Sequence, residues 1–289
     1  MEKIIKEKIS SLLSEEEEVL SVEQLGGMTN QNYLVKTSSN QYIVKFFGKG
    51  TDKLIDRQNE KFNLELLKDL NLDVKNYLFD IESGIKVNEY IDSATTLDST
   101  SIKTKFEKIA PILQTIHASG KELRGEFAPF EEIKKYESLI QGEISYPNYE
   151  AVRESVFSLK EELEQIGIEK KSCHIDLVPE NFIEGPDGHL YLIDWEYSSM
   201  NDPMWDLAAL FLESEFTPDE EDSFLSYYES EQTPVSREKI RIYKILQDII
   251  WSLWTIYKEE NGADFGDYGI TRYKRAVKEL QSQGGIDED

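Results

Sequence analysis

The fold class is decided by residues 173–197, which read CHIDLVPENFIEGPDGHLYLIDWEY. The residues GPDG at 185–188 stand between two apolar runs, and this pattern predicts a β-hairpin. Asn181 precedes the first predicted strand and Asp194 follows the second. Because a hairpin brings the start of one strand beside the end of the other, we expect both side chains at its open end. Asp176 comes shortly before that end, in a predicted loop.

The three residues are of the types that phosphoryl transfer requires. Mg²⁺ binds a few oxygen ligands and leaves its other positions to phosphate oxygens and water, so Asn181 and Asp194 are sufficient protein ligands beside ATP. Asp176 is then available to accept a hydroxyl proton. A catalytic Asp, an Asn five residues later and a metal-binding Asp at a strand end form the kinase template. If these residues are only turn and cap residues, three matching spacings are coincidences.

Two departures from the protein-kinase pattern favour a small-molecule substrate. Ile175 stands where protein kinases carry an Arg that contacts a phosphorylated activation loop, and Asp194 is followed by Trp195 and Glu196 rather than by Phe and Gly. No such loop separates Asp194 from the next predicted helix. The pattern therefore indicates a kinase of a small molecule.

Four motifs carry a resemblance to a known family. They are GGMTNQNYLVK at 26–36, CHIDLVPENF at 173–182, LIDWEYSSMNDPMWDLA at 192–208 and WSLWTIYKE at 251–259. The chain resembles the aminoglycoside phosphotransferase and choline kinase superfamily, and within it bacterial choline kinases. The resemblance implies an α+β, bilobal protein-kinase-like fold. The order of short helix, strands, helix and strands suits a small, β-rich nucleotide-binding lobe over residues 1–88, and a larger, mainly helical lobe then follows over 89–289.

Composition agrees with a nucleotide-dependent enzyme. A chain of 289 residues can bury a substantial core. The net charge of −25 repels nucleic acid and anionic membranes, so neither is an expected partner. Cys173 is the one cysteine, which excludes an internal disulfide. Without a long apolar stretch or a signal-peptide pattern, we expect no membrane insertion and a cytoplasmic location.

The loop at Gly26-Gly27 is the candidate phosphate-binding loop. Its glycines let backbone amides approach a phosphate, and Thr29, Asn30 and Asn32 add hydrogen-bond donors. A simple hairpin turn explains the Gly-Gly pair equally well.

Other nucleotide contacts follow from the kinase template and the resemblance. The strands NYLVK and QYIVK form a predicted hairpin in which Lys45 is the phosphate-binding lysine and Lys36 its competitor. The resemblance makes Glu60, on a predicted helix, the partner of Lys45. It also makes the segment after 85–88 a connector whose Glu89, Tyr90 and Ile91 offer contacts to adenine.

Aromatic residues identify the expected acceptor. A quaternary ammonium has no hydrogen-bond donor and is best held by π-faces and nearby carboxylates. In a predicted helix at 239–259, Ile242, Ile245, Ile249, Leu253 and Ile256 share one side, while Trp251 and Trp254 lie on another. Such a second stripe is also typical of a protein core. The resemblance assigns both tryptophans to a choline cage with Tyr197, Glu213 and Tyr268, and Glu196 is a further candidate nearby.

The implied reaction is transfer of the γ-phosphoryl group of ATP to the hydroxyl of choline, with Mg²⁺ as cofactor. Asp176 would accept the proton, His174 would hold the loop, and Asp206 would brace it. Asp202, followed by Pro203, is expected to cap a helix. The resemblance further suggests that phosphocholine is used to decorate bacterial surface polymers.

Three other functions are compatible with parts of the sequence. The acceptor could be ethanolamine, thiamine or an aminoglycoside. An iron oxygenase would use His174, Asp176 and His189 as a facial triad, but His189 lies in a predicted turn only fifteen residues from His174. A non-catalytic choline-binding module would need the aromatic residues alone, and turnover of ATP with an acceptor would exclude it.

Overall fold

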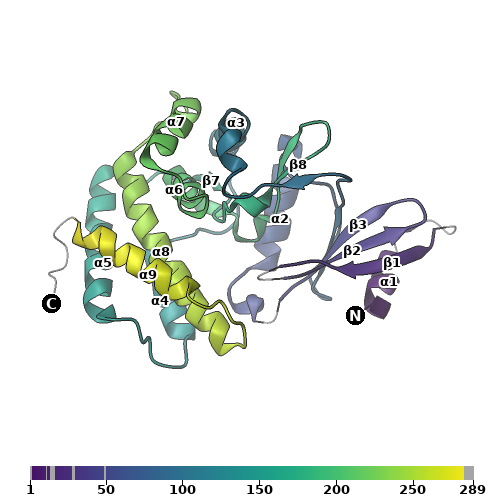
Figure 1. Cartoon of the computed structure of the whole chain (residues 1–289), viewed down its shortest axis with the longest axis horizontal. Coiled ribbons are helices and arrows are strands. Elements are labelled where there is room, and N and C mark those ends of the chain that lie inside the picture. Colours follow the sequence, from purple (N-terminus) through teal and green to yellow (C-terminus); the bar gives the residue numbers. More distant parts are fainter. Residues whose placement is uncertain (1, 11, 14–16, 28–29, 49, 283–289) are drawn as a thin grey trace. The chain divides into compact units, whose positions relative to one another are not determined.

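The computed structural model describes residues 2–10, 12–13, 17–27, 30–48 and 50–282. The chain forms two compact units, one of Met1–Leu97 with Glu180–Glu196 and one of Asp98–Pro179 with Tyr197–Asp289 (Figure 1). The first unit therefore includes residues 89–97 and the hairpin at 182–192, which the division at position 88 assigned to the second lobe. Thr29, a predicted nucleotide contact, lies outside the described residues.

The first unit is built on an antiparallel sheet of five strands in the order β1-β2-β3-β5-β4. The expected hairpin of NYLVK and QYIVK is confirmed as β2 and β3. Ile5 and Ile9 of the first helix are fully buried in one cluster with apolar side chains of the sheet. The elements are α1 (Glu2–Ser10), β1 (Val19–Gln24), β2 (Gln31–Thr37), β3 (Gln41–Phe46), α2 (Arg57–Leu67), β4 (Asn76–Asp80) and β5 (Ile85–Glu89).

The central hairpin is also confirmed. Strands β8 (Phe182–Glu184) and β9 (Leu190–Leu192) pair antiparallel, and β6 (Thr95–Thr96) adds a third strand beside β8. Gly185 N donates to His189 O at 2.8 Å and Gly188 N donates to Gly185 O at 2.9 Å, which closes the turn. Gly188 has φ of 80°, a conformation that glycine adopts without strain.

The second unit is mainly helical. Helix α8 carries the predicted aromatic stripe, and its side chains are buried on nearly all sides because α4, α6 and α9 pack against it (Figure 1). Strands β7 and β10 pair antiparallel, and in sequence they stand before and after Glu180–Glu196, the segment that belongs to the first unit. The elements are α3 (Phe106–His117), α4 (Pro129–Leu139), α5 (Tyr149–Ile166), β7 (Lys171–Cys173), β10 (Ser199–Asn201), α6 (Pro203–Glu213), α7 (Pro218–Tyr228), α8 (Arg237–Glu260) and α9 (Tyr268–Gln281).

Helix starts in the second unit follow their sequence signals. The predicted cap at Asp202 is confirmed, since its carboxylate accepts from Met204 N at 3.0 Å and Pro203 occupies the first turn of α6. Thr217 and Glu220 form a reciprocal capping box at α7. Among the described residues, no helix combines the length and the apolar character needed to cross a bilayer.

Candidate active site

The loop that carries Asp176 follows β7 and is fixed by Asp206 of α6. The two oxygens of the buried Asp206 carboxylate accept from the backbone N–H groups of His174 and Ile175, both at 2.8 Å. Trp205 Nε1 donates to Ile175 O at 3.0 Å. Ile175 has φ of 78°, which is rare for a β-branched residue, so these contacts hold a strained backbone next to Asp176. The expected role of Asp206 as a brace is confirmed.

A second contact set supports the brace from α3. His117 Nε2 lies 3.1 Å from Asp206 Oδ2, and His117 Nδ1 lies 2.7 Å from the Tyr228 hydroxyl. Cys173 is fully buried beside this group, and burial together with the charge of Asp206 raises the pKa of its thiol well above the usual range. A thiol with a raised pKa is a poor nucleophile, so Cys173 is not a candidate for nucleophilic catalysis.

Asn181 and Asp194 flank the open end of the hairpin in the first unit, and that both side chains bind one metal ion stays a prediction. Ile193 N donates to Asn181 O at 2.8 Å, which brings the residue before β8 beside the residues after β9. Lys45 Nζ lies 2.7 Å from Asp194 Oδ1. Although burial lowers the pKa of Lys45, the charges of Asp194 and Glu196 raise it overall, so the ammonium stays charged. The structure thus joins the predicted phosphate-binding lysine to a predicted metal ligand.

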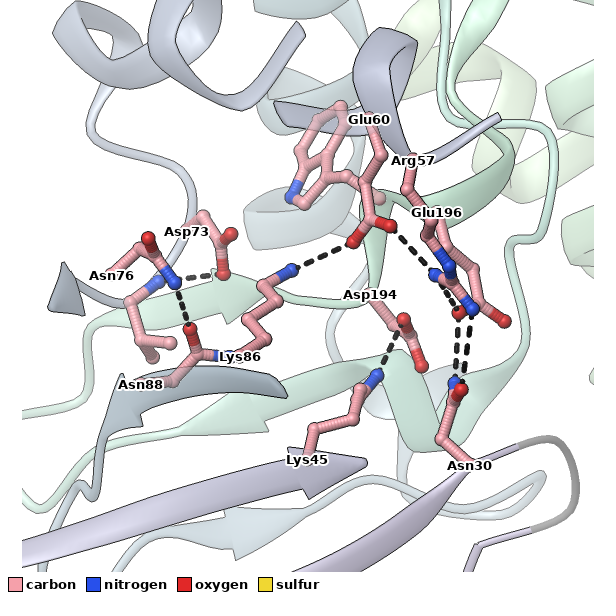
Figure 2. Close-up of polar contacts among 12 residues, drawn as sticks. Asn30, Lys45, Arg57, Glu60, Asp73, Asn76, Lys86, Asn88, Asp194 and Glu196 are labelled. Atoms are coloured by element: carbon pink, nitrogen blue, oxygen red, sulfur yellow. Dashed lines mark hydrogen bonds and ion pairs between the residues drawn. The ribbon is translucent and has the colours of Figure 1, made fainter. Parts of the chain in front are cut away.

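Behind this pair, buried charges form a network that the sequence interpretation did not predict (Figure 2). Arg57 Nη1 donates to Glu60 at 2.6 Å and to Glu196 at 2.9 Å, and Lys86 Nζ donates to Glu60 at 3.1 Å. Lys45 was expected to pair with Glu60, but its ion pair is with Asp194, and Glu60 influences it only through its charge. The local reason is that Arg57 starts α2 three residues before Glu60, on the same side of the helix.

Glu196, a further candidate for the choline cage, is buried among polar partners within the first unit. Asn30 Nδ2 donates to it at 2.8 Å. Burial, with the charge of Asp194, raises the pKa of Glu196. Asn30 Oδ1 accepts from Gly48 N at 3.2 Å, so this predicted nucleotide contact links two loops of the first unit.

The turn at Gly26-Gly27 is closed by Asn32. Its Nδ2 donates to Gly26 O at 3.0 Å, and Leu25 N donates to its backbone oxygen at 2.8 Å. A side chain at Gly27 would collide with Asn30 O and with the Asn32 amide, so glycine is required there for space. Asn32 therefore shapes the candidate phosphate loop.

The predicted adenine connector follows β5 in the first unit. Glu89 N donates to Lys75 O at 2.8 Å, while Tyr90 and Ile91 are half-buried. Ile91 lies near the turn at Gly185. Their contact with adenine stays a prediction.

The predicted aromatic cage residues adjoin one another in the second unit. The ring centres of Tyr197 and Trp251 are 5.6 Å apart, and those of Trp251 and Trp254 are 6.5 Å apart. Phe265, which the sequence interpretation missed, continues the row at 4.9 Å from Trp254 and 6.5 Å from Tyr268. We call these five residues the aromatic row. Edge-to-face contacts leave ring faces that a cation can approach.

Asp176 acts electrostatically on the aromatic row. Burial raises the pKa of Tyr268, and the charges of Glu213 and Asp176 add to this increase, whereas Arg272 lowers it. Burial likewise raises the pKa of Tyr136, with contributions from Glu132 and Asp176. The charge of the predicted base thus reaches Tyr268, one of the predicted cation-binding residues, in the same unit.

Glu213 was expected to face the choline nitrogen, but it is ion-paired within the protein. Arg272 Nη2 donates to Glu213 Oε1 at 2.6 Å, and Arg272 Nη1 donates to the Tyr268 hydroxyl at 2.8 Å. The sequence interpretation did not include Arg272. Its position four residues after Tyr268 on a helix, where side chains are neighbours, was the available signal.

Comparison with known proteins gives consistent matches over nearly the whole chain. A model of the choline/ethanolamine kinase family matches residues 22–277. Protein LicA of Haemophilus influenzae is 30% identical over 268 residues, which cover 89% of this chain and 79% of that protein.

Solved structures agree with this result. The crystal structure of choline kinase LicA from Streptococcus pneumoniae has 80% sequence identity and a TM-score of 0.95, and the match covers 98% of this chain and 99% of that chain. A structure of LicA in complex with AMP matches with 81% identity and a TM-score of 0.92, covering 97% of this chain and 98% of that chain. The α+β, protein-kinase-like fold class predicted from the sequence is confirmed.

Proposed function

The chain belongs to the choline/ethanolamine kinase family, as its motifs predict, and we propose that it transfers the γ-phosphoryl group of ATP to the hydroxyl of choline. The products are phosphocholine and ADP. The observation that carries this proposal is the aromatic row itself, because it gathers cation-binding rings in the unit that also holds Asp176, whose charge contributes to the raised pKa of Tyr268. Because the chain belongs to a kinase family, the alternative of an iron oxygenase is rejected.

The chain's own residues divide the work of the reaction. Asp176 accepts the proton of the choline hydroxyl. The hydroxyl oxygen of choline forms a bond to the γ-phosphorus, and the bond between the γ-phosphorus and the oxygen bridging to the β-phosphorus breaks, which releases ADP. Lys45, held charged and buried, contacts phosphate oxygens and balances their negative charge. The aromatic row holds the trimethylammonium group and so orients the hydroxyl towards ATP.

The residues at the open end of the hairpin fit a magnesium ion. The backbone hydrogen bond from Ile193 N to Asn181 O brings Asn181 beside the residue that precedes Asp194, and Mg²⁺ prefers amide and carboxylate oxygens when ATP supplies its other ligands. When bound, Mg²⁺ supplies positive charge to the transferring phosphate. Since ATP is the phosphoryl donor, we place the reaction in the cytoplasm.

The catalytic role is tested with Asp176→Asn. We expect kcat with choline to fall by about 10²- to 10⁴-fold, since the general base is lost, while ATP affinity is kept. Asp187→Asn, the same chemical change in the exposed turn of the hairpin, is the control and should retain wild-type activity. Unchanged turnover in Asp176→Asn would refute the assignment of the base.

The acceptor is tested with choline, ethanolamine, thiamine and an aminoglycoside under the same conditions. Wild-type protein should turn over choline with the highest kcat/KM. In Trp254→Ala the KM for choline should rise by about tenfold, as expected from the loss of a cation–π contact, while the KM for ATP stays within about twofold. Highest turnover with a primary amine or an aminoglycoside would contradict the proposed acceptor.

We further propose, from the resemblance to bacterial choline kinases, that the phosphocholine is used to decorate surface polymers. Labelled choline supplied to cells that lack this gene should then fail to enter the cell envelope, and the wild-type gene should restore the label. Equal labelling in the presence and absence of the gene would contradict this role.

A further inference from the structure

Arg272 lies at the centre of a buried charge cluster beside the aromatic row. Its side chain is 4% exposed and contacts Glu213 at 2.6 Å, the Tyr268 hydroxyl at 2.8 Å and Asp248 Oδ1 at 3.3 Å. The guanidinium carbon is 5.1 Å from the centre of the Tyr268 ring. Arg272 thus links the last residue of α6 to the first residue of α9.

The charges in this cluster balance. Asp248 of α8 also accepts two bonds from Arg275, both at 2.6 Å, so two carboxylates face two guanidinium groups. Burial lowers the pKa of Arg272, but the charges of Glu213 and Asp248 raise it, and the net pKa lies above its usual value. Arg272 therefore remains charged. The Glu213 carboxylate, the expected partner of the acceptor nitrogen, is therefore already neutralised by Arg272.

This arrangement affects quaternary and primary ammonium groups differently. A trimethylammonium group donates no hydrogen bond and needs only ring faces and a nearby negative charge. A primary ammonium has three N–H donors, and burying them without acceptors is costly. Trp254 Nε1 is buried without a hydrogen-bond partner in the described part of the chain, but an indole N–H only donates. Arg272 also only donates, so neither group can accept from a primary amine.

We propose that Arg272 determines acceptor specificity: by holding Glu213, it removes the carboxylate that would accept hydrogen bonds from a primary ammonium, and so favours choline over ethanolamine. This inference rests on the proposed choline kinase function. Arg272 acts through Glu213 and Tyr268 as a positioning residue. Because it also donates to the Tyr268 hydroxyl, it fixes the ring at the end of the aromatic row.

The test is the ratio of kcat/KM for choline to kcat/KM for ethanolamine in Arg272→Met. Methionine fills similar space without charge and releases Glu213. We expect the ratio to fall by about tenfold, the factor given by one hydrogen bond to a charged group, chiefly through a lower KM for ethanolamine. Arg275→Met is the matched control, since Arg275 contacts Asp248 but has no hydrogen bond or ion pair to Glu213 or Tyr268 within the described residues. Its ratio should match wild type.

A second variant covers the case in which Arg272→Met does not fold. In Glu213→Gln the KM for both acceptors should rise by a similar factor, because Arg272 loses its partner and repels any cation, and the ratio should stay within about twofold. Preferential loss of ethanolamine turnover would show that Glu213 already binds the primary ammonium, and would overturn the inference.

The outcomes separate the inference from the function on which it rests. An active Arg272→Met enzyme with an unchanged ratio overturns the specificity role alone, while choline kinase activity stands. Wild-type protein that phosphorylates neither acceptor overturns both. A loss of stability lowers turnover of both acceptors equally, so it leaves the ratio unchanged and cannot imitate the expected result.

Discussion

Asp73, whose pKa is influenced by Lys45 and Lys86, illustrates how one residue links stability to pH. It lies before β4, where Val74 N donates to its carboxylate at 2.8 Å. Burial raises the pKa of Asp73 to about 7, and the charge of Asp194 adds to this, while Lys86 and Lys45 lower it. Between its unfolded pKa and about 7 the folded protein therefore keeps a proton that the unfolded chain has lost. For this residue, stability falls as the pH rises through that window.

We predict that Asp73→Asn stabilises the protein at pH 8. The neutral amide removes the cost of ionising Asp73, and the gain should be about 1–2 kcal/mol, below the full linkage value because the side chain is partly exposed. Urea unfolding at pH 5 and pH 8 checks this, since the gain should be small at the lower pH. The exposed Asp92→Asn is the control. An equal effect at both pH values would contradict the raised pKa.

At the residue scale, the sequence was informative where spacing in the chain implied spacing in the fold. The position of Asn181 and Asp194 at the hairpin end was predicted on this basis, whereas Asp206 as a brace came from the family resemblance. The pairing of Arg57 with Glu196 was not predicted, because the two residues are far apart in sequence and neither has a local signature. Glu213 was assigned to the acceptor by the family resemblance, and its pairing with Arg272 depends on how α6 and α9 pack.

At the element scale, two helix caps of similar chemistry differ in their surroundings. Asp202 is fully buried and accepts from Lys239 Nζ at 2.8 Å and from Glu169 N at 3.0 Å in addition to its capping bond. Thr217 caps the next helix at an exposed position. A cap alone contributes about 1 kcal/mol, whereas removing one partner of a buried ion pair costs about 3–5 kcal/mol.

We therefore expect Asp202→Ala to lower the free energy of unfolding by about 3 kcal/mol or more, and Thr217→Ala by about 1 kcal/mol. The difference arises because Lys239 would be left buried without its carboxylate. Urea denaturation of both variants measures it. Similar losses of unfolding free energy in the two variants would mean that Lys239 contacts another partner or solvent. The double variant Asp202→Ala/Lys239→Met should then be no more stable than Asp202→Ala.

Elements were predictable from the sequence where local chemistry determines them. The GPDG turn, the cap at Asp202 and the apolar periodicity of α8 each gave the correct element. The short strands β6, β7 and β10 gave no such signal, because two or three residues show no periodicity and their pairing depends on distant segments. Residues 89–97 belong to the first unit for the same reason, since β6 pairs with the distant strand β8 of that unit.

At the scale of the whole molecule, the net charge of −25 sets the response to salt. Excess like charge destabilises a folded chain, and ions screen it. We predict that raising NaCl from about 0.02 M to about 0.3 M increases Tm by about 2–5 °C, since exposed ion pairs that salt also weakens contribute little each. Thermal unfolding followed by circular dichroism measures this. KCl should act equally, and a lower Tm at higher salt would show that ion pairs dominate.

The first unit is completed by Glu180–Glu196, which the ribosome adds only after Asp98–Pro179. A nascent chain that ends near Leu97 already contains Lys45 and Arg57, but Asp194 and Glu196 have yet to be translated. The residues up to Leu97 therefore cannot complete the first unit until Glu180–Glu196 have been translated. Strand β6 cannot pair until β8 has been translated. We therefore expect the residues up to Leu97 to depend on chaperones until translation has passed the central hairpin.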